Sequence, residues 1–231
     1  MDKIRGQFST KEEALKNKKD HQVALWNGDD HKFYLIDYDH IAEFIESLTT
    51  KNRVFHEVIP ADRPQKLRFD IDFKEEWNIS EKEKAEYRDK ILEAIVLTFL
   101  EIFGIDLDLE KDLLVFCGSK KPLEGHIVIN NYYVSSSRQA KFFYDKVAAN
   151  NSIYFVKDEV NHCILDRQIY SNNLKLYKNQ KLNKDKTRSN NPKILANAYE
   201  YIGETIYQSN NIDFRETLIT YIDNCQELPD Q

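Results

Sequence analysis

Two aspartates stand one residue apart in the segment Leu67–Phe73, whose other residues are mostly apolar. Side chains of a strand alternate between its faces, so Asp70 and Asp72 would share one face of a strand built from this segment. Like charges this close repel each other, and a divalent cation bound by carboxylate oxygens would relieve the repulsion. The pair predicts a site for a hard divalent metal ion. A solvated strand face in an acidic protein would give the same pattern.

Two later segments add residue types that bind phosphate, and a third carboxylate. Ser119 and Lys121 lie in the loop 118–125, and His126 follows at the start of an apolar run. Further along, Asp166 precedes a lysine-rich stretch. Carboxylates that hold metal ions, with Ser, Lys and His side chains around a triphosphate, are what metal-dependent nucleotidyl transfer requires. Each residue also has an ordinary interpretation, His126 as a hydrogen-bonded strand residue and Asp166 as the cap of a turn.

The elements that must position these residues follow from hydrophobic periodicity, capping boxes and turn residues. Strands are expected at 23–26, 32–37, 53–59, 67–73, 113–117, 126–130, 164–170 and 174–177. Helices are expected at 10–19, 39–48, 80–104, 136–149, 194–207 and 214–222. Runs of strands with a few helices predict an α+β domain built largely on antiparallel sheet.

Composition limits the class of protein. With 231 residues, 41% hydrophobic and 12% aromatic, the chain can bury a sizeable core without disulfides. Its three cysteines, Cys117, Cys163 and Cys225, show no C-x-x-C spacing, which disfavours a disulfide framework and a zinc ribbon and favours a reducing compartment. The first residues, 1–5, lack the apolar region of a signal peptide, and no apolar run approaches the ~20 residues needed to cross a bilayer. We expect an intracellular protein of the cytoplasm or a viral replication compartment, neither secreted nor bound to a membrane.

Basic residues are concentrated in one stretch although the net charge is −6. The stretch 175–188 has a single acidic residue and the following cations: Lys175, Lys178, Lys181, Lys184, Lys186 and Arg188. A solvated surface loop has this composition, and so does a segment that binds the phosphates of a nucleic acid.

Taken in order, these motifs resemble those of the archaeo-eukaryotic primase superfamily, in particular its primase-polymerase and large-DNA-virus primase branch. The family's D-x-D strand is matched by Leu67–Phe73, its Ser and Lys before a His by Ser119–His126, and its Asp before a Tyr and a basic strand by Asp166–Lys181. Glu124 stands where many relatives carry a small hydroxyl residue. The resemblance covers roughly residues 20–185 and implies an RRM-like palm of antiparallel sheet flanked by helices.

The resemblance also implies roles for individual residues. Asp70, Asp72 and Asp166 would ligate two Mg²⁺ or Mn²⁺ ions. The triphosphate would be bound by Ser119, Lys121, His126, Lys175 and Lys181. Single-stranded DNA would be bound by aromatic stacking and by the cations Arg68, Lys178, Lys184, Lys186 and Arg188. Arg68 shares a strand face with the two aspartates, so it could instead be their ion-pair partner.

The implied activity is that of a DNA-dependent primase-polymerase, which makes short primers on a single-stranded DNA template from NTPs or dNTPs during DNA replication. A virus or mobile element is the expected origin and a replicative helicase the expected partner. Residues 1–185, with core motifs at 66–181, would form the catalytic domain, and 186–231 a basic linker with a small helical C-terminal segment. Three alternatives stay open: a primer-extending or damage-tolerant polymerase without priming activity, a catalytically silent DNA-binding replication-initiation module, and a metal-dependent nuclease. The D-x-D context disfavours the nuclease, because it lacks the Glu-rich or His-rich site that such enzymes tend to use.

Overall fold

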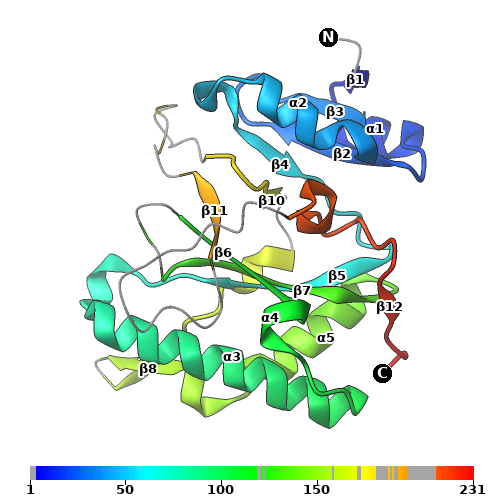
Figure 1. Ribbon diagram of the computed structural model, residues 1–231. Helices are drawn as coiled ribbons and strands as arrows, with labels where there is room; N and C mark the ends of the chain where they lie inside the picture. The colour runs from blue at the N-terminus through cyan, green and yellow to red at the C-terminus, as the bar shows by residue number, and fades with distance from the viewer. Residues whose placement is uncertain are drawn as a thin grey trace.

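Two five-stranded sheets form the framework of the protein, as a computed structural model shows (Figure 1). The structure describes residues 4–118, 121, 123–157, 159–170, 173–180, 187, 189, 192–196 and 212–231. One sheet lies above the other in Figure 1, with helices on either side of the first and below the second. The strands pair mostly antiparallel, so the expected α+β class is confirmed in these coarse terms.

The N-terminal sheet gathers four early strands and one late one. Its order is β1 (Ile4–Phe8), β3 (Phe33–Asp37), β2 (Gln22–Asn27), β4 (Phe55–Glu57) and β10 (Leu174–Lys175). The helices α1 (Lys11–Asn17) and α2 (Ile41–Ser47) lie against it (Figure 1). Short 3-10 turns, η1 (Tyr38–His40) and η2 (Thr50–Asn52), flank α2. Because β10 pairs with β4, the sheet carries part of the third motif next to N-terminal residues.

The second sheet is organised around β7 (Gly125–Val134), its longest strand. This strand pairs with β6 (Leu113–Gly118), β5 (Gln65–Ile71) and, in parallel, β12 (Gln226–Glu227), while β11 (Lys193–Ala196) pairs with β6. The register places Asp70 opposite His126. Residues directly opposite each other share one face of a sheet, so the first and second motifs meet there.

Helices cover the lower face of the second sheet in Figure 1. The long helix α3 (Glu81–Phe103) begins with a capping box between Ser80 and Glu83 and ends at Gly104 in the left-handed conformation, as the sequence predicts. Its apolar residues pack with α5 (Ser137–Ala148) and the sheet in one buried cluster. The shorter elements around them are η3 (Glu75–Trp77), α4 (Leu109–Asp112), η4 (Asn151–Ile153) and the hairpin of β8 (Tyr154–Lys157) and β9 (Val160–Cys163).

The segment 173–180 is hydrogen-bonded to both sheets. Toward the first sheet, the backbone N–H groups of Leu176 and Gln180 donate to the carbonyls of Phe55 and Arg53. Toward the second, the Lys178 N–H donates to the Lys193 carbonyl, and the Lys193 N–H donates to the carbonyl of Asn179, each at 2.9 Å. The segment 173–180 therefore joins the two sheets through backbone hydrogen bonds.

The C-terminal residues are fastened to the junction of the sheets by a buried carboxylate. Glu57, which is 1% exposed, accepts hydrogen bonds from the backbone N–H groups of Ile219 and Thr220 at 2.8 Å, and from the Thr220 hydroxyl at 2.7 Å. Nearby, the Lys66 ammonium donates to the Glu216 carbonyl. Apolar residues of this segment belong to the buried cluster that includes residues of both sheets.

Three expected elements are wrong in the described residues. The helix expected from 194 begins instead as strand β11, and the rest of that range lies outside the described residues. The helix expected at 214–222 is a single 3-10 turn, η7 (Phe214–Thr217). The strand expected at 164–170 is a one-residue bridge at Leu165 followed by the 3-10 turn η5 (Arg167–Tyr170). The C-terminal segment, where described, consequently has no α-helix and consists of the turn η7, bends and the short strand β12.

Besides β11, four strands of the described residues were not expected from the sequence. They are the edge strand β1, the hairpin strands β8 and β9, and the two-residue strand β12.

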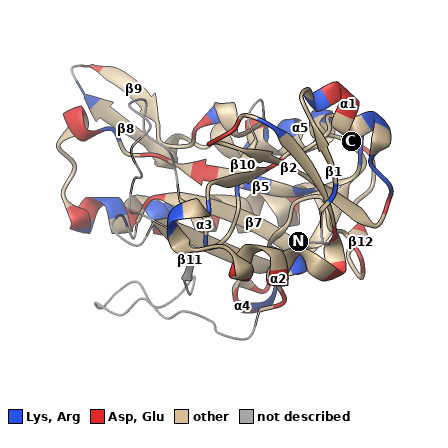
Figure 2. Ribbon diagram, turned by 90° about the horizontal axis from the view of Figure 1, so that it is seen from above, with Lys and Arg blue, Asp and Glu red and all other residues tan. Residues whose placement is uncertain are grey.

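Acidic and basic residues are interspersed over both sheets and the helices around them (Figure 2). No helix within the described ranges is long and apolar enough to span a bilayer.

Replacing Glu57 by alanine is expected to lower the free energy of unfolding by about 2–4 kcal/mol, because two buried backbone N–H groups lose their acceptor. Urea unfolding followed by circular dichroism measures the change. Glu101→Ala, at an exposed position of α3, removes the same charge and is the control. Equal stability of the two variants would show that Glu57 does not hold the C-terminal segment.

Candidate active site

The three predicted metal-binding aspartates are brought together by a short antiparallel contact between distant parts of the chain. Ile71 bridges Leu165, the Asp72 N–H donates to the Ile164 carbonyl at 3.1 Å, and the Asp166 N–H donates to the Asp70 carbonyl at 2.8 Å. Each of these contacts is made by the backbone. The end of β5 and the start of the third motif are thus held in a fixed register, with their carboxylates at one cavity.

This cavity has a volume of about 780 Å³ and is lined by residues of both sheets. A volume of this size suits a small organic ligand such as a nucleotide. Of the predicted site residues, the following line it: Asp70, Asp72, Asp166, Lys121, His126 and Lys175. Residues from all three sequence motifs therefore meet at one surface.

The negative charge of Asp70 is disfavoured by its surroundings in the cavity. Its side chain is 26% exposed and lies with its Oδ1 atom 3.5 Å from Nε2 of His126. Burial, and then the negative charges of Asp72 and Asp166, raise the pKa of Asp70 to about 7. Lys193 and Lys175 act in the opposite direction without cancelling these effects. A cation bound beside this carboxylate would therefore stabilise its ionised form.

The other two carboxylates have partners in the protein. Asp72 forms an ion pair with Lys74, and Oδ1 of Asp166 accepts a hydrogen bond from the Gln168 N–H at 2.9 Å. Asp166 thus caps the turn η5 as well as lining the cavity. In the described ranges, no three His, Cys, Asp or Glu side chains lie close enough together to hold a metal ion. The oxygen donors suit Mg²⁺ or Mn²⁺ in chemical kind, but binding would require Asp72 to leave Lys74.

His126 owes its position to the glycine before it. A Cβ atom on Gly125 would lie 2.1 Å from the Phe116 carbonyl oxygen, so only glycine lets β7 begin this close to β6. The Nδ1 atom of His126 is buried without a hydrogen-bond partner. Burial, followed by the nearby charges of Lys193 and Lys175, lowers the pKa of His126 well below its ordinary value. The imidazole is therefore neutral at pH 7.

Lys193 is a cavity residue that the sequence analysis missed. Its ammonium group is buried, with 3% of the residue exposed, and donates to the Lys175 carbonyl at 2.8 Å while lying 4.3 Å from the centre of the Phe116 ring. Burial and then the charge of Lys175 lower the pKa of Lys193 well below its ordinary value. Two ammonium groups facing one cavity disfavour each other and favour an anion between them.

Trp26 and His56 also line the cavity and were not predicted as site residues. Both come from the N-terminal sheet, outside the three motifs. For Lys193 the proline before it gave no decisive signal, because a proline at that place suits the start of a helix as well as the start of an edge strand. For Trp26 and His56 no local signal existed, because only the pairing of β2 with β4 and of β4 with β10 brings them to the motifs.

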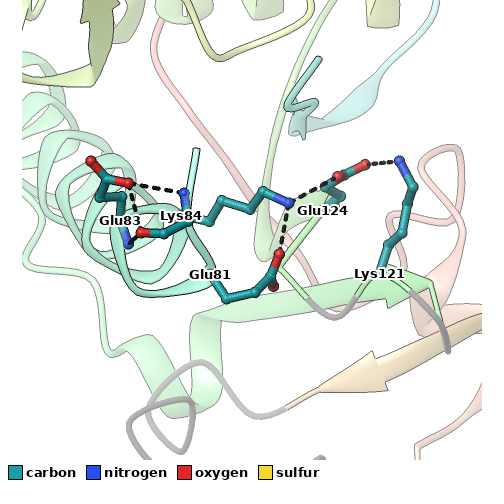
Figure 3. A network of polar contacts seen from close by, with 6 residues as sticks. Glu81, Glu83, Lys84, Lys121 and Glu124 are labelled. Carbon is teal, nitrogen blue, oxygen red and sulfur yellow. Dashed lines mark hydrogen bonds and ion pairs between the residues drawn. The ribbon is translucent and has the colours of Figure 1, made fainter. Parts of the chain in front are cut away.

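Lys121 belongs to a chain of ion pairs at the rim of the cavity (Figure 3). Its ammonium group lies 2.8 Å from the Glu124 carboxylate, whose other oxygen lies 4.0 Å from Nζ of Lys84 on α3. Lys84 also pairs with Glu81 at 2.8 Å (Figure 3). Glu124, which stands where a hydroxyl residue was expected, thus connects Lys121 to α3. A triphosphate that bound Lys121 would compete with Glu124 for it.

The role expected for Arg68 in binding nucleic acid is contradicted by its burial. The residue is 1% exposed, donates to Oε1 of Gln65 at 2.8 Å, and stacks on the Tyr170 ring with its guanidinium carbon 4.6 Å from the centre. Tyr170 in turn donates its hydroxyl to the Arg68 carbonyl. Arg68 is therefore a structural residue, buried on the face of β5 that it shares with Asp70.

The remaining predicted contacts lie away from the cavity or outside the described residues. Lys178 pairs with Glu46 at 2.8 Å and does not line the cavity. The other predicted cations and the predicted serine are not among the described residues: Ser119, Lys181, Lys184, Lys186 and Arg188. Their proposed contacts with the triphosphate or with DNA stay predictions.

Comparison with known proteins gives one partial similarity of note. No protein-family profile matches the chain. A protein of African swine fever virus (isolate Pig/Kenya/KEN-50/1950), named "Putative helicase/primase complex protein", is 30% identical over 141 residues. The similarity covers 54% of this chain and 14% of the viral protein. The chain thus resembles a small part of a longer protein whose name associates it with a helicase/primase complex.

Asp70→Asn is expected to stabilise the metal-free protein at high pH. Because the pKa of Asp70 is about 7 in the folded state against 3.8 in its ordinary environment, its ionisation opposes folding increasingly as the pH rises through this interval. In EDTA at pH 8 the variant should gain about 1–3 kcal/mol in free energy of unfolding, and below pH 4 the gain should vanish.

Thermal unfolding at several pH values measures this difference. Asp106→Asn, at an exposed position, is the matched control and should show no such dependence. A stability change for Asp70→Asn that is the same at pH 4 and pH 8 would mean that neither burial nor the neighbouring carboxylates raise the pKa of Asp70.

Proposed function

We propose that the protein is a nucleotidyltransferase of DNA replication, a primase-polymerase that joins nucleoside triphosphates on a single-stranded DNA template. The observation that carries the proposal is the meeting of Asp70, Asp72 and Asp166 at the cavity that also receives Lys175 and Lys193. Carboxylates beside ammonium groups suit a reaction in which metal ions and a triphosphate must be held together. On this proposal, the second sheet with α3 and α5 is the RRM-like palm of the family that the motifs resemble.

The viral similarity supports the biological setting of the proposal. Thirty per cent identity to a protein named for a helicase/primase complex favours a role in viral DNA replication, with a helicase as partner. Because the similarity spans 14% of that protein, the activity and partners of the whole viral protein do not transfer directly. A compartment in which a virus replicates its DNA inside the cell would be the place of action.

In the proposed reaction the protein contributes position and charge. Two Mg²⁺ or Mn²⁺ ions held by Asp70, Asp72 and Asp166 would activate the attacking 3′-hydroxyl and neutralise the triphosphate. Lys175 and Lys193 would bind the phosphates and stabilise the charge that develops as pyrophosphate leaves. His126, held neutral at pH 7, would contact a phosphate oxygen as a hydrogen-bond donor from Nε2 and hold the Asp70 side of the cavity in place.

A catalytically silent DNA-binding module is the second candidate, and one observation favours it. Asp72 pairs with Lys74 and Asp166 caps a turn, so two of the three carboxylates already have partners in the protein. In such a module the carboxylates would be structural and the cavity would bind a nucleotide or a DNA end without reacting. A polymerase that extends primers but does not start them is the third candidate, which the site alone does not separate from a primase.

The decisive experiment is primer-independent synthesis on single-stranded DNA with labelled NTPs or dNTPs and Mg²⁺ or Mn²⁺. We expect short products from the wild type, and a loss of at least about 1,000-fold for Asp70→Ala/Asp72→Ala, which removes the metal-binding oxygens. Asp89→Ala/Glu93→Ala, on the exposed face of α3, removes the same number of carboxylates and should leave synthesis intact.

Each result of this experiment selects one candidate. Extension of a supplied primer without unprimed synthesis would favour the extending polymerase. DNA binding with no incorporation under any condition would favour the silent module and contradict the proposal. Equal activity of the two double variants would move the metal site away from Asp70 and Asp72.

Lys193→Met is expected to weaken nucleoside triphosphate binding by roughly 10- to 100-fold, because one buried charge-assisted contact to phosphate is lost. Titration calorimetry with the nucleotide in the presence of Mg²⁺ measures the dissociation constant. Lys193→Arg keeps the charge and should recover part of the affinity, whereas Lys82→Met, at an exposed position of α3, is the neutral control. Unchanged binding by Lys193→Met would remove this lysine from the proposed site.

A further inference from the structure

Trp26, His56 and Lys175 form a row across three neighbouring strands of the N-terminal sheet. Trp26 pairs directly with His56 between β2 and β4, and His56 pairs directly with Lys175 between β4 and β10. Residues that pair in this way project from the same face of a sheet. All three residues line the 780 Å³ cavity that contains the aspartates. An aromatic ring, an imidazole and an ammonium group thus follow one another along one wall.

Trp26 is the largest side chain of this row and lies at its end. Its ring is 5.3 Å from that of His56, with an angle of 58° between the ring planes, and 5.7 Å from that of His31. Trp26 is partly buried, whereas its neighbours on the same face, Ala24 and Val58, are fully buried in the small cluster below it. One part of the indole is therefore packed and another part faces the cavity.

We propose that Trp26 is the platform on which the base of the bound nucleoside triphosphate stacks. The proposal rests on the proposed function, since it takes the cavity as the nucleotide site. With the phosphates at Lys175 and Lys193, the ribose would pass His56 and the base would reach Trp26.

The spacing of the row matches this arrangement. Adjacent strands of a sheet lie about 4.8 Å apart, so Trp26 and Lys175, two strands apart, are separated by about 10 Å. In an extended nucleotide the base and the terminal phosphates are separated by a comparable length. Stacking on an aromatic side chain does not depend on the hydrogen-bonding edge of a base, since every base offers a π face. The platform would therefore accept all four bases, as template-directed synthesis requires.

The two tryptophans of the chain make this assignment directly measurable. Trp77 lies in η3, packs against the rings of Phe155 and His162, and does not line the cavity. In a Trp77→Phe variant, Trp26 is the only tryptophan, and its fluorescence reports on the cavity. We expect ATP or GTP with Mg²⁺, in the absence of DNA, to quench this fluorescence with saturation. Inorganic tripolyphosphate, which has no base, should displace the nucleotide without quenching.

Affinity gives an independent readout. In titration calorimetry, Trp26→Ala should weaken ATP binding roughly 5- to 100-fold and leave tripolyphosphate binding unchanged, while Trp26→Phe should retain most of the ATP affinity. His31→Ala, which removes a ring that touches Trp26 outside the cavity lining, is the matched control and should bind ATP like the wild type. Circular dichroism establishes whether each variant is folded. If Trp26→Ala does not fold, the comparison is made with Trp26→Phe alone.

The outcomes separate this inference from the proposed function. Equal quenching by ATP and tripolyphosphate, or quenching by a single-stranded oligonucleotide but not by ATP, would overturn the assignment of Trp26 to the nucleotide base. That result would not bear on the synthesis experiment, so the proposed function would stand. Base-dependent quenching without any synthesis would support the platform and contradict the polymerase. Failure of ATP to bind at all would overturn the platform and leave the proposed function to be decided by the synthesis experiment.

Discussion

The short antiparallel contact between residues 70–72 and 164–166 is the constraint on which the candidate site depends. It is made by backbone groups on both sides, so it fixes the separation of Asp70 from Asp166 independently of what their side chains do. Without it, the end of β5 and the third motif would be connected only through almost a hundred residues of intervening chain. Arg68 and Tyr170 support the contact, because the guanidinium stacks on the Tyr170 ring and the Tyr170 hydroxyl donates to the Arg68 carbonyl.

Around this contact the protein tolerates an unfavourable arrangement of charge. Asp70 is crowded by two carboxylates on one side, and Lys193 is buried beside Lys175 on the other. Both sets face one cavity, where the charges of Lys193 and Lys175 act on Asp70 without cancelling the effects that raise its pKa. Such arrangements lower stability in the absence of a ligand and are most often found where a ligand supplies the missing charges. A metal ion with a triphosphate carries charges of both signs and would compensate both sets at once.

Local patterns in the sequence predict much of this arrangement. Where a prediction from the sequence is wrong, the reason is physical. The D-x-D strand, the capped helix α3 and the strand that begins near His126 are encoded within short windows by alternation, capping and apolar periodicity. The sequence predicts a helix where strand β11 lies, because the short apolar run of this segment fits either structure. The segment is a strand because it pairs with β6. Arg68 was misassigned because alternation along a strand gives the face but not what covers it. Trp26 and His56 reach the cavity only through pairing between strands distant in sequence, which no local window contains.

The segment 173–180 has a consequence for how the molecule can be divided. Since its backbone is hydrogen-bonded to β4 on one side and to Lys193 on the other, the N-terminal sheet cannot separate from the second sheet without breaking bonds within both. Unfolding should therefore be a single cooperative event for the two sheets. A shortened chain that began at β5 would keep every aspartate of the candidate site yet leave β10 without its partner strand, so the smallest autonomous unit includes the N-terminal sheet.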